Sequence, residues 1–548
     1  MLLLVAAAAT WLVACSGDDD GGGHRDRSIA IGYYTQPDSL DPAMGFTLVS
    51  GAPLSQVYLP LLTYRRAEDQ SGTQLIPGLA EDLPELSADR LTYSLRLKKG
   101  LRYSDGTPIR AGDFELAIKR LLNMGSGAAP FYENIAGARA YERSHDQNAD
   151  IAGIETDDRA RTIRVRLERP YAAFDHLLAL TVATPVPKNT PFENQTEHPP
   201  PSTGPFEITT SEPNRQFVLE RNPRFESLHV EGVPPAKVDR ITVKIIADKS
   251  KQAEDVLDGR LDYMYDSPPA DLLPTIEKRA SDRYEEHLLT GSTNWFFMNG
   301  RLAPFDDPLV RRAVNYAVDK PALARIYAGG LQEGCSFIPP GMPGYDKRLD
   351  TSGCPFGDPR KPPDLKRARA LIREAGAEGA KVTVWGFDQT PQADISQAYA
   401  ETLNKIGLDA SVKLVNFAIW RETIGNAKNR PQTGFDAFTQ AFPHPLTFFE
   451  LVQTGAIRPT SNKNTSNISD PVIDSTVRRL EREPDIASVT EDWRRLNRYL
   501  VERAYLVPYG HRIRGTFVSD RIDFEHCTFF HPIYLEDWSH FCLKEGEE

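Results

Sequence analysis

The chain has 548 residues, of which 40% are hydrophobic and 26% are charged, a composition typical of globular proteins. Its 64 Lys and Arg residues are outnumbered by 76 Asp and Glu, and the two signs are interspersed along the chain. Without a basic stripe, nucleic acid is disfavoured as a partner, because binding to phosphates requires clustered cations. The length exceeds that of one ordinary hydrophobic core and predicts two or three domains.

The first 14 residues are uncharged and almost wholly apolar, and Cys15 follows them directly. Such a run is too short to span a bilayer and predicts a secretory signal peptide over residues 1–14. Residues 12–15 (LVAC) resemble the bacterial lipobox, which implies that Cys15 carries a lipid and anchors the chain to the cell membrane from outside the cytoplasm. The basic residue that usually follows Met1 is missing, which leaves the true start codon open, and a buried N-terminal helix with an incidental cysteine is the alternative. Residues 15–27 are polar and glycine-rich and predict a flexible tether.

Predicted strands and helices alternate along the rest of the chain. Apolar side chains with a period of two predict strands at 91–97, 163–167 and 241–245, and a further strand is expected at 261–265. Helical spacing of apolar residues, with capping signals at the ends, predicts helices over 253–257 (ending before Gly259), over 308–318 (after Asp307) and over 364–375 (closed by Gly376), the last followed by a strand at 381–385. This alternation predicts an α/β fold.

Four cysteines remain once Cys15 is set aside. Cys335 and Cys354 flank a loop rich in proline and glycine, and Cys527 and Cys542 flank an aromatic segment near the C-terminus. Four cysteines allow three disulfide connectivities, of which the sequence-local pairing is the simplest. An extracytoplasmic location favours disulfides, and free buried thiols are the alternative.

The sequence lacks the common catalytic patterns. It contains neither the His-Glu-x-x-His zinc motif, nor the Gly-x-Ser-x-Gly elbow, nor a phosphate-binding P-loop. The eleven histidines are scattered, and no cluster of His, Met and carboxylates has the spacing of metal ligands. We therefore expect no enzyme, no catalytic residue, no metal and no cofactor. Carboxylates that meet only in three dimensions keep an extracytoplasmic hydrolase open as an alternative.

An ordered series of short motifs resembles the extracytoplasmic solute-binding proteins of ABC importers, in the oligopeptide/dipeptide/nickel-binding family. The motifs are PDSLDP (37–42), YLPLLTY (58–64), LIPGLAE (75–81), YSDGTP (103–108) with AGD (111–113), TGPF (203–206) with RNP (221–223), PFDDP (304–308) with VRRA (310–313), and PPGMPGY (339–345). Each motif alone is mostly turn chemistry, but their shared order from residue 28 to about 510 is specific.

The resemblance implies a periplasmic-binding-protein-like α/β architecture, with two lobes joined by a hinge and a third domain inserted in the first lobe. The chain would form the first lobe from residues 28–60, 200–289 and 506–548, the extra domain from 61–199 and the second lobe from 290–505. The ligand would bind between the lobes, which close around it and then meet the importer's permease subunits.

The sequence departs from the family in the second lobe. Peptide-binding members have a segment in which an aspartate binds the free amine of the peptide, and residues 438–445 correspond to it here. Phe438 falls on the family tryptophan, Ala441 on the amine-binding aspartate and His444 on a second acid, so both carboxylates are missing. Either the ligand lacks that amine, or another acid supplies the charge. Glu450 is a candidate substitute, although a solvated helix residue is its simpler interpretation.

Further candidate ligand contacts follow from the resemblance. Thr439 and Gln440 lie in the same segment as Ala441. The segment 294–300 borders the cleft in relatives, which selects Trp295 and Asn299, although aromatic residues at alternate positions are more often core. Tyr34, after the first strand, is a weaker candidate.

We expect a monomeric lipoprotein that binds oligopeptides or peptide-like solutes for an ABC importer. A binder of a non-peptide solute, such as an oligosaccharide or a metal chelate, and a receptor that senses peptides without transport are the alternatives.

Overall fold

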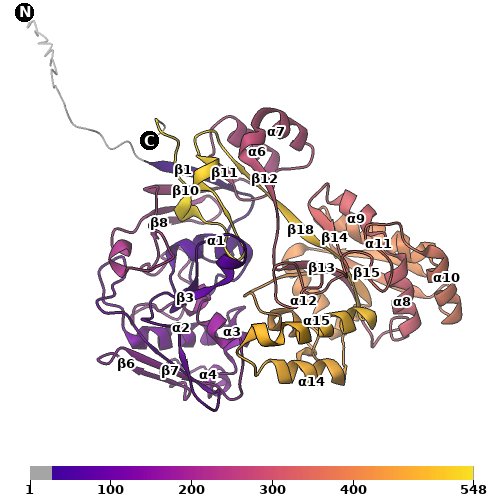
Figure 1. The fold of residues 1–548 in the computed structure, drawn as a ribbon, viewed down its shortest axis with the longest axis horizontal. Coiled ribbons are helices and arrows are strands. Elements are labelled where there is room, and N and C mark those ends of the chain that lie inside the picture. The colour runs from indigo at the N-terminus through magenta and orange to yellow at the C-terminus, as the bar shows by residue number, and fades with distance from the viewer. Residues whose placement is uncertain (1–26, 547–548) are drawn as a thin grey trace, which may run out of the picture.

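The computed structural model describes residues 27–546, so the predicted signal peptide, Cys15 and most of the tether lie outside the described residues. The predicted α/β class is confirmed, because helices and strands alternate through the described chain. Figure 1 shows two bodies that lie next to each other and are joined by the strands β12 (Tyr284–Leu288) and β18 (Leu506–Val518). Within the described part, no helix is both long and apolar enough to cross a bilayer.

The first lobe is built on a mixed sheet around β1 (Ser28–Tyr33). β1 pairs in parallel with β10 and β11, and β9 and β8 extend the sheet in antiparallel order. Ile29, Ile31 and Tyr33 alternate along β1 and are buried. The other elements are α1 (Leu48–Val57), β8 (Phe206–Glu212), β9 (Gln216–Arg221), β10 (Arg240–Ile245), α6 (Lys249–Leu257), β11 (Tyr263–Met264), α7 (Leu273–Ala280), α16 (Phe524–Cys527), β19 (Phe530–His531) and β20 (Leu535–Glu536).

The range expected for the extra domain holds a separate four-stranded antiparallel sheet in the order β4-β5-β7-β6, packed against α2. Strands alternate inward and outward side chains, as Ile163 and Val165 are buried while Arg164 and Arg166 are exposed. The elements are β2 (Leu62–Tyr64), β3 (Leu75–Pro77), β4 (Glu85–Leu86), β5 (Thr92–Arg96), α2 (Ala111–Asn123), α3 (Ala129–Tyr132), α4 (Ala138–Ser144), β6 (Ile154–Asp157), β7 (Thr162–Arg166) and α5 (Phe174–Leu177).

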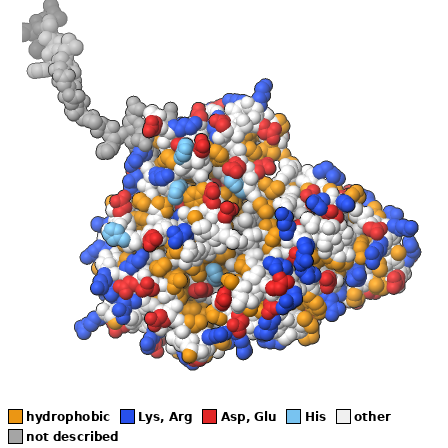
Figure 2. All heavy atoms as spheres, viewed as in Figure 1, with side chains coloured by type: hydrophobic (Ala, Val, Ile, Leu, Met, Phe, Trp, Pro, Cys, Tyr) orange, Lys and Arg blue, Asp and Glu red, His pale blue; other side chains and the backbone are white. Residues whose placement is uncertain are grey.

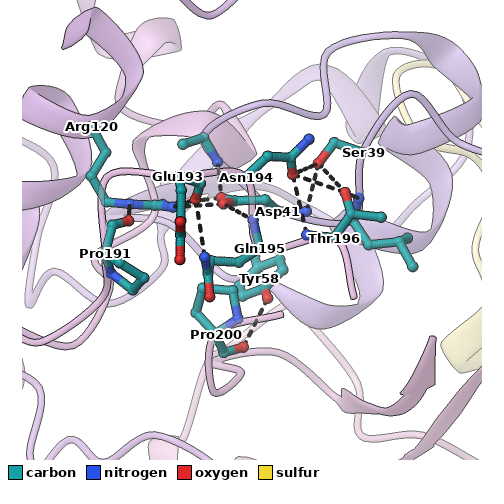
Figure 3. Close-up of polar contacts among 12 residues, drawn as sticks. Ser39, Asp41, Tyr58, Arg120, Pro191, Glu193, Asn194, Gln195, Thr196 and Pro200 are labelled. Carbon is teal, nitrogen blue, oxygen red and sulfur yellow. Dashed lines mark hydrogen bonds and ion pairs between the residues drawn. The ribbon is translucent and has the colours of Figure 1, made fainter. Parts of the chain in front are cut away.

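A buried ion pair fastens this domain to the first lobe (Figure 3). Arg120 of α2 donates to both carboxylate oxygens of Asp41, at 3.0 and 2.6 Å, and neither side chain is exposed. Asp41 belongs to the PDSLDP motif, and its carboxylate also accepts the backbone N–H of Ala43 and of Gln195 at 2.9 Å. The motif aspartate therefore joins three segments that are far apart in sequence.

The second lobe is a sheet in the order β16-β15-β17-β13 with helices packed around it. The helices predicted after Asp307 and Asp364 begin as expected, because each aspartate caps its helix with its side chain. The elements are β13 (Ser292–Met298), α8 (Pro308–Ala317), α9 (Lys320–Ile326), β14 (Leu331–Glu333), α10 (Leu365–Glu374), β15 (Lys381–Phe387), α11 (Gln392–Lys405), β16 (Asp409–Val415), α12 (Trp420–Ile424), β17 (Thr433–Thr439), α13 (Leu446–Phe449), α14 (Pro471–Leu480) and α15 (Ile486–Glu502).

β18 runs through both bodies. Residues 506–510 pair with β13 of the second lobe, and residues 513–518 pair with β12 and β11 of the first lobe. β18 begins at Leu506, and its first half belongs to the sheet of the second lobe. Two adjacent strands, β12 and β18, thus carry the chain between the bodies.

The structure joins Cys335 to Cys354 and Cys527 to Cys542, the sequence-local pairing. The first bridge closes a loop of the second lobe, and the second ties α16 to the C-terminal segment of the first lobe. Acidic and basic side chains are intermixed over the face drawn in Figure 2, consistent with the interspersed charges of the sequence.

Candidate functional site

A cavity of about 400 Å3 lies between the two bodies. Phe46 of the first lobe and Phe131 of the extra domain form one wall, and the second lobe forms the rest. The lining residues of the second lobe are Trp295, Arg421, Glu422, Ile424, Asp436, Phe438, Thr447, Glu450, Leu451, Ser461, Asn462, Lys463 and Thr465. A concave space with aromatic walls and a few charged groups is the usual form of a small-ligand site.

Strand register places three of these side chains together. β13 and β17 are antiparallel neighbours, and Trp295 lies directly opposite Asp436. Phe438 is two residues further along β17 and therefore points to the same face of the sheet as Asp436. The two strands give this cavity an aromatic wall with one acid set into it.

The acid in that wall is fully partnered. Asp436 is 1% exposed and forms an ion pair with Arg421 of α12. Its second carboxylate oxygen accepts the hydroxyl of Thr465 at 2.9 Å, and Arg421 also donates to the carbonyl oxygen of Ala437. A buried carboxylate with these partners is a structural group, because removing either partner would leave a charge without compensation.

A second acid, Glu450, is held from across the cleft. The hydroxyl of Tyr171, in the extra domain, donates to a Glu450 carboxylate oxygen at 2.7 Å. Burial raises the pKa of Glu450, and the hydrogen bond from Tyr171 and the charge of Lys463 oppose that rise. Sequence reasoning preferred a solvated helix residue here; the structure instead sets Glu450 half-buried in the cavity wall, directly after α13.

Among the cations, the charge of Lys463 lowers the pKa of Glu450 most. Its Nζ lies 5.3 Å from the ring centre of Phe131, so it faces the extra domain across the cleft. Burial lowers the pKa of the Lys463 ammonium, and Glu450 acts in the opposite direction. Within the described residues, Lys463 makes no ion pair at 4.0 Å or closer.

Contacts beside the cavity hold the two bodies together. Phe131 packs edge-on against Phe442 at 5.8 Å. Arg169 of the extra domain forms an ion pair at 2.8 Å with Glu481 at the end of α14, and the backbone N–H of Ala172 donates to the Glu481 carbonyl oxygen. The structure therefore shows the cleft with its walls in contact.

Two of the eight predicted ligand contacts line the cavity. Trp295 is 3% exposed and packs edge-on against Phe337, and Phe438 is half-buried beside Phe448. Asn299 lies at the end of β13, where its Nδ2 donates to the Pro431 carbonyl oxygen and its Oδ1 accepts the N–H of Arg301. Its side chain is used for local structure and is not among the lining residues.

The other candidates lie beside the cavity rather than in its wall. Thr439 hydrogen-bonds to Ser292, and Gln440 donates from Nε2 to the carbonyl oxygen of Pro532 in the first lobe at 3.1 Å. The N–H of Ala441 lies 3.4 Å from the hydroxyl of Thr447, which does line the cavity.

His444 and Tyr34 are further removed from the lining. His444 is buried, its Nδ1 accepts the N–H of Leu446, and burial holds its pKa well below the usual range, so it stays neutral. Tyr34 lies on the first lobe under the ammonium of Lys249, 4.2 Å from the ring centre. Neither residue is among those lining the cavity.

Sequence reasoning missed most of the charged lining. Asp436 could have been found, because it is two residues from Phe438 on one strand and so shares its face. Phe46, Phe131 and Lys463 come from loops or a short helix, and no periodic pattern marks them. Tyr171 is brought to Glu450 only by the contact between the extra domain and the second lobe.

Two α/β bodies, connected by two strands and enclosing a lined cavity, define a two-lobe binding protein. Comparison with known proteins identifies the family to which this two-lobe protein belongs. The family model of bacterial extracellular solute-binding proteins, family 5 (Middle), matches residues 74–458. The match covers more than half of the chain, and the chain belongs to this family.

Individual proteins agree with this assignment. The dipeptide-binding protein DppE of Bacillus subtilis is 23% identical over 498 residues, which cover 88% of this chain and 86% of DppE. The solved structure of clavulanic acid biosynthesis oligopeptide binding protein 2 has a TM-score of 0.85 at 24% identity, covering 95% of this chain and 96% of that chain. The DppA structure from Helicobacter pylori, in complex with the peptide STSA, has a TM-score of 0.75 at 19% identity, covering 94% and 98%.

Proposed function

We propose that this protein captures peptides or peptide-like solutes between its lobes and delivers them to the permease of an ABC importer. The observation that carries the proposal is the cavity between the lobes, with Phe46 and Phe131 on one side and Trp295 and Phe438 on the other. The dipeptide-binding relative DppE, aligned over 88% of this chain, supports a peptide ligand.

Closure of the two lobes around the ligand links ligand binding to delivery. Within the described residues the chain passes between the bodies only at β12 and β18, so the lobes can rotate about these strands while each lobe keeps its own core. A ligand that contacts both walls stabilises the closed form, and a permease that recognises both lobes together then accepts the loaded protein.

The proposal includes location and assembly. We infer that Cys15 carries a lipid that holds the protein outside the cytoplasm at the cell membrane, and that the protein acts as a monomer without catalysis. The lipobox-like residues 12–15 and the polar residues 16–27 support the anchor. Labelling with a radioactive fatty acid tests it, and a Cys15→Ser variant that still takes up the label would contradict it.

Ala441 favours a second candidate, a ligand without the free amine that peptide-binding relatives hold with aspartate. In that case the solute is a blocked peptide, an oligosaccharide or a metal chelate. A receptor that senses peptides without transport would use the same cavity, and it would lack permease and ATPase genes nearby.

Native mass spectrometry of the purified full chain tests the proposed function. A co-purified ligand is released, and its mass and fragmentation are determined. We expect peptides or peptide-like molecules, and the Trp295→Ala variant should retain less of them, because it removes an aromatic wall. Recovery of an oligosaccharide or chelate alone would overturn the peptide assignment and favour the second candidate.

A further inference from the structure

Two of the charged side chains that line the cavity, Glu450 and Lys463, form no ion pair with each other within 4.0 Å, and a further lining acid, Glu422, is exposed on α12. Glu450 receives the Tyr171 hydroxyl as its one hydrogen-bond donor among the described residues, and Lys463 has no ion pair there within 4.0 Å. By contrast, Asp436 is fully occupied by Arg421 and Thr465. Two charges of opposite sign thus line the same cavity, the half-buried Glu450 and the more exposed Lys463, each with bonding capacity left over.

Glu450 has the geometry to bind a cation. An ionised carboxylate accepts about four hydrogen bonds, so the bond from Tyr171 leaves room for an ammonium group. Tyr171 also fixes the direction of the carboxylate from the opposite side of the cleft. Burial raises the pKa of Glu450, and a cationic partner from the ligand would restore the ionised form.

Lys463 complements this acid as an anion-binding group. Its ammonium lies over the face of Phe131 at 5.3 Å, a position that orients the charge without satisfying its three hydrogen-bond donors. Burial lowers the pKa of Lys463, and an anionic partner would again stabilise the charged form. The other lining cation, Arg421, is already paired with Asp436.

Between these charges the cavity is walled by aromatic rings. Phe46 and Phe131 pack at 5.9 Å on one side, and Trp295 and Phe438 form the other side with Leu451 nearby. A cavity of about 400 Å3 lies near the lower end of the range for small-ligand sites. Its size and walls suit a compact ligand with an apolar body.

We propose that the cavity binds a small zwitterion with an apolar or aromatic side chain, with its ammonium group on Glu450 and its carboxylate on Lys463. This inference rests on the proposed function and names its ligand: a very short peptide with free termini, or a single amino acid of the same chemistry. Glu450 then supplies the negative charge that Ala441 does not.

In the test, the full-length protein is incubated with two pools of compounds, and native mass spectrometry detects what it binds. One pool contains apolar and aromatic amino acids, and the other contains di- and tripeptides made from them. Each is offered with free termini, after N-acetylation and after C-terminal amidation. We expect selective capture of members with both termini free, and the two pools separate the amino-acid source from the peptide source. The best binder is then measured by calorimetry.

Three predicted effects follow for the variants. Glu450→Gln keeps an acceptor for Tyr171 but loses the charge, and should weaken the best binder about 10- to 100-fold while leaving the weak binding of its N-acetyl form unchanged. Lys463→Met should weaken it similarly and leave its amide form unchanged. The controls Glu378→Gln and Lys428→Met alter exposed charges of the second lobe outside the cavity and should bind as the unmodified protein does.

The outcomes separate this inference from the proposed function. If blocked peptides bind as tightly as free ones, or if Glu450→Gln binds the free ligand unchanged and folds with an unchanged thermal midpoint, the zwitterion inference is wrong and peptide binding stands. If no amino acid or peptide of any form binds and a sugar or chelate co-purifies, both proposals are wrong.

Discussion

Replacing Asp41 by Asn tests how the PDSLDP motif holds the fold together. Asp41 and Arg120 are both fully buried, and the carboxylate accepts four hydrogen bonds: two from the guanidinium and two from backbone N–H groups. The amide has nearly the same shape as the carboxylate. The substitution therefore changes charge and hydrogen bonding and leaves packing in place.

The expected loss follows from these contacts. The amide nitrogen would face donors, so at least one hydrogen bond is lost. The Arg120 guanidinium stays buried without an anionic partner, bonded to the carbonyl oxygens of Pro191 and Glu193 and to the one remaining side-chain oxygen. Breaking one side of a buried ion pair costs about 3–5 kcal/mol. Because α2 carries Arg120, the loss should loosen the extra domain against the first lobe.

Urea unfolding followed by circular dichroism measures the free energy of unfolding, and hydrogen exchange reports on the amides of α2. The control is Glu212→Gln, since its partner Arg215 is 74% exposed and such pairs contribute at most about 1 kcal/mol. A loss in Asp41→Asn no larger than that of the control, with α2 exchanging at the unmodified rate, would refute the structural role of this pair.

Three further predictions concern a disulfide and two titrating groups. Replacing Cys335 and Cys354 by serine opens a bridge with a sequence separation of 19 and should lower the free energy of unfolding by about 3 kcal/mol; a melting temperature that reducing agent and the double variant leave unchanged would contradict this. Burial and the Arg66 charge lower the pKa of His531 to about 3. Below about pH 6.5 the unfolded chain therefore binds a proton at this residue that the folded chain does not bind. The free energy of unfolding should fall between pH 6.5 and 3 by up to about 1.4 kcal/mol per pH unit for this group. His531→Gln should flatten that decline in urea titrations at several pH values. Burial raises the pKa of Glu450, so affinity for a free-amine ligand should fall on acidification from neutral pH, whereas calorimetry on Glu450→Gln should show no such fall.

Sequence reasoning predicted much of the architecture, because local chemistry determines where helices begin and end. Asp307 and Asp364 cap their helices with their side chains, and Gly259 takes a left-handed conformation (φ +72°) just after α6, as the turn chemistry predicts. These signals depend on neighbouring residues only. Their order along the chain then resembles one family, and the resemblance supplied the two-lobe arrangement that no single signal contains.

The site was accessible only in part, for a physical reason. Trp295 and Phe438 lie on strands, where alternation and the family pattern point to the cleft. The pairing of Tyr171 with Glu450 joins residues 279 positions apart through the contact of two bodies, and no local pattern encodes it. The acid missing at position 441 was visible in the sequence, and so was Glu450 as a candidate substitute, but the hydrogen bond of Glu450 to Tyr171 is a property of the closed cleft.

The charges in the cavity couple ligand binding to closure. Tyr171 and Phe131 belong to the extra domain, whereas Glu450 and Lys463 belong to the second lobe, so opening about β12 and β18 separates each charge from its neighbour across the cleft and returns it to water. Closing the empty cleft therefore takes Glu450, and to a lesser degree the still exposed Lys463, out of water with no opposite charge of the described residues within 4.0 Å of either, which opposes closure. A zwitterion supplies both partners in the closed form alone, and such a difference in affinity between two states is what shifts their populations. A ligand of one charge would offset only part of this cost. The argument therefore predicts that scattering from the protein in solution shows full compaction with the free-termini ligand, and incomplete compaction with its acetylated or amidated form.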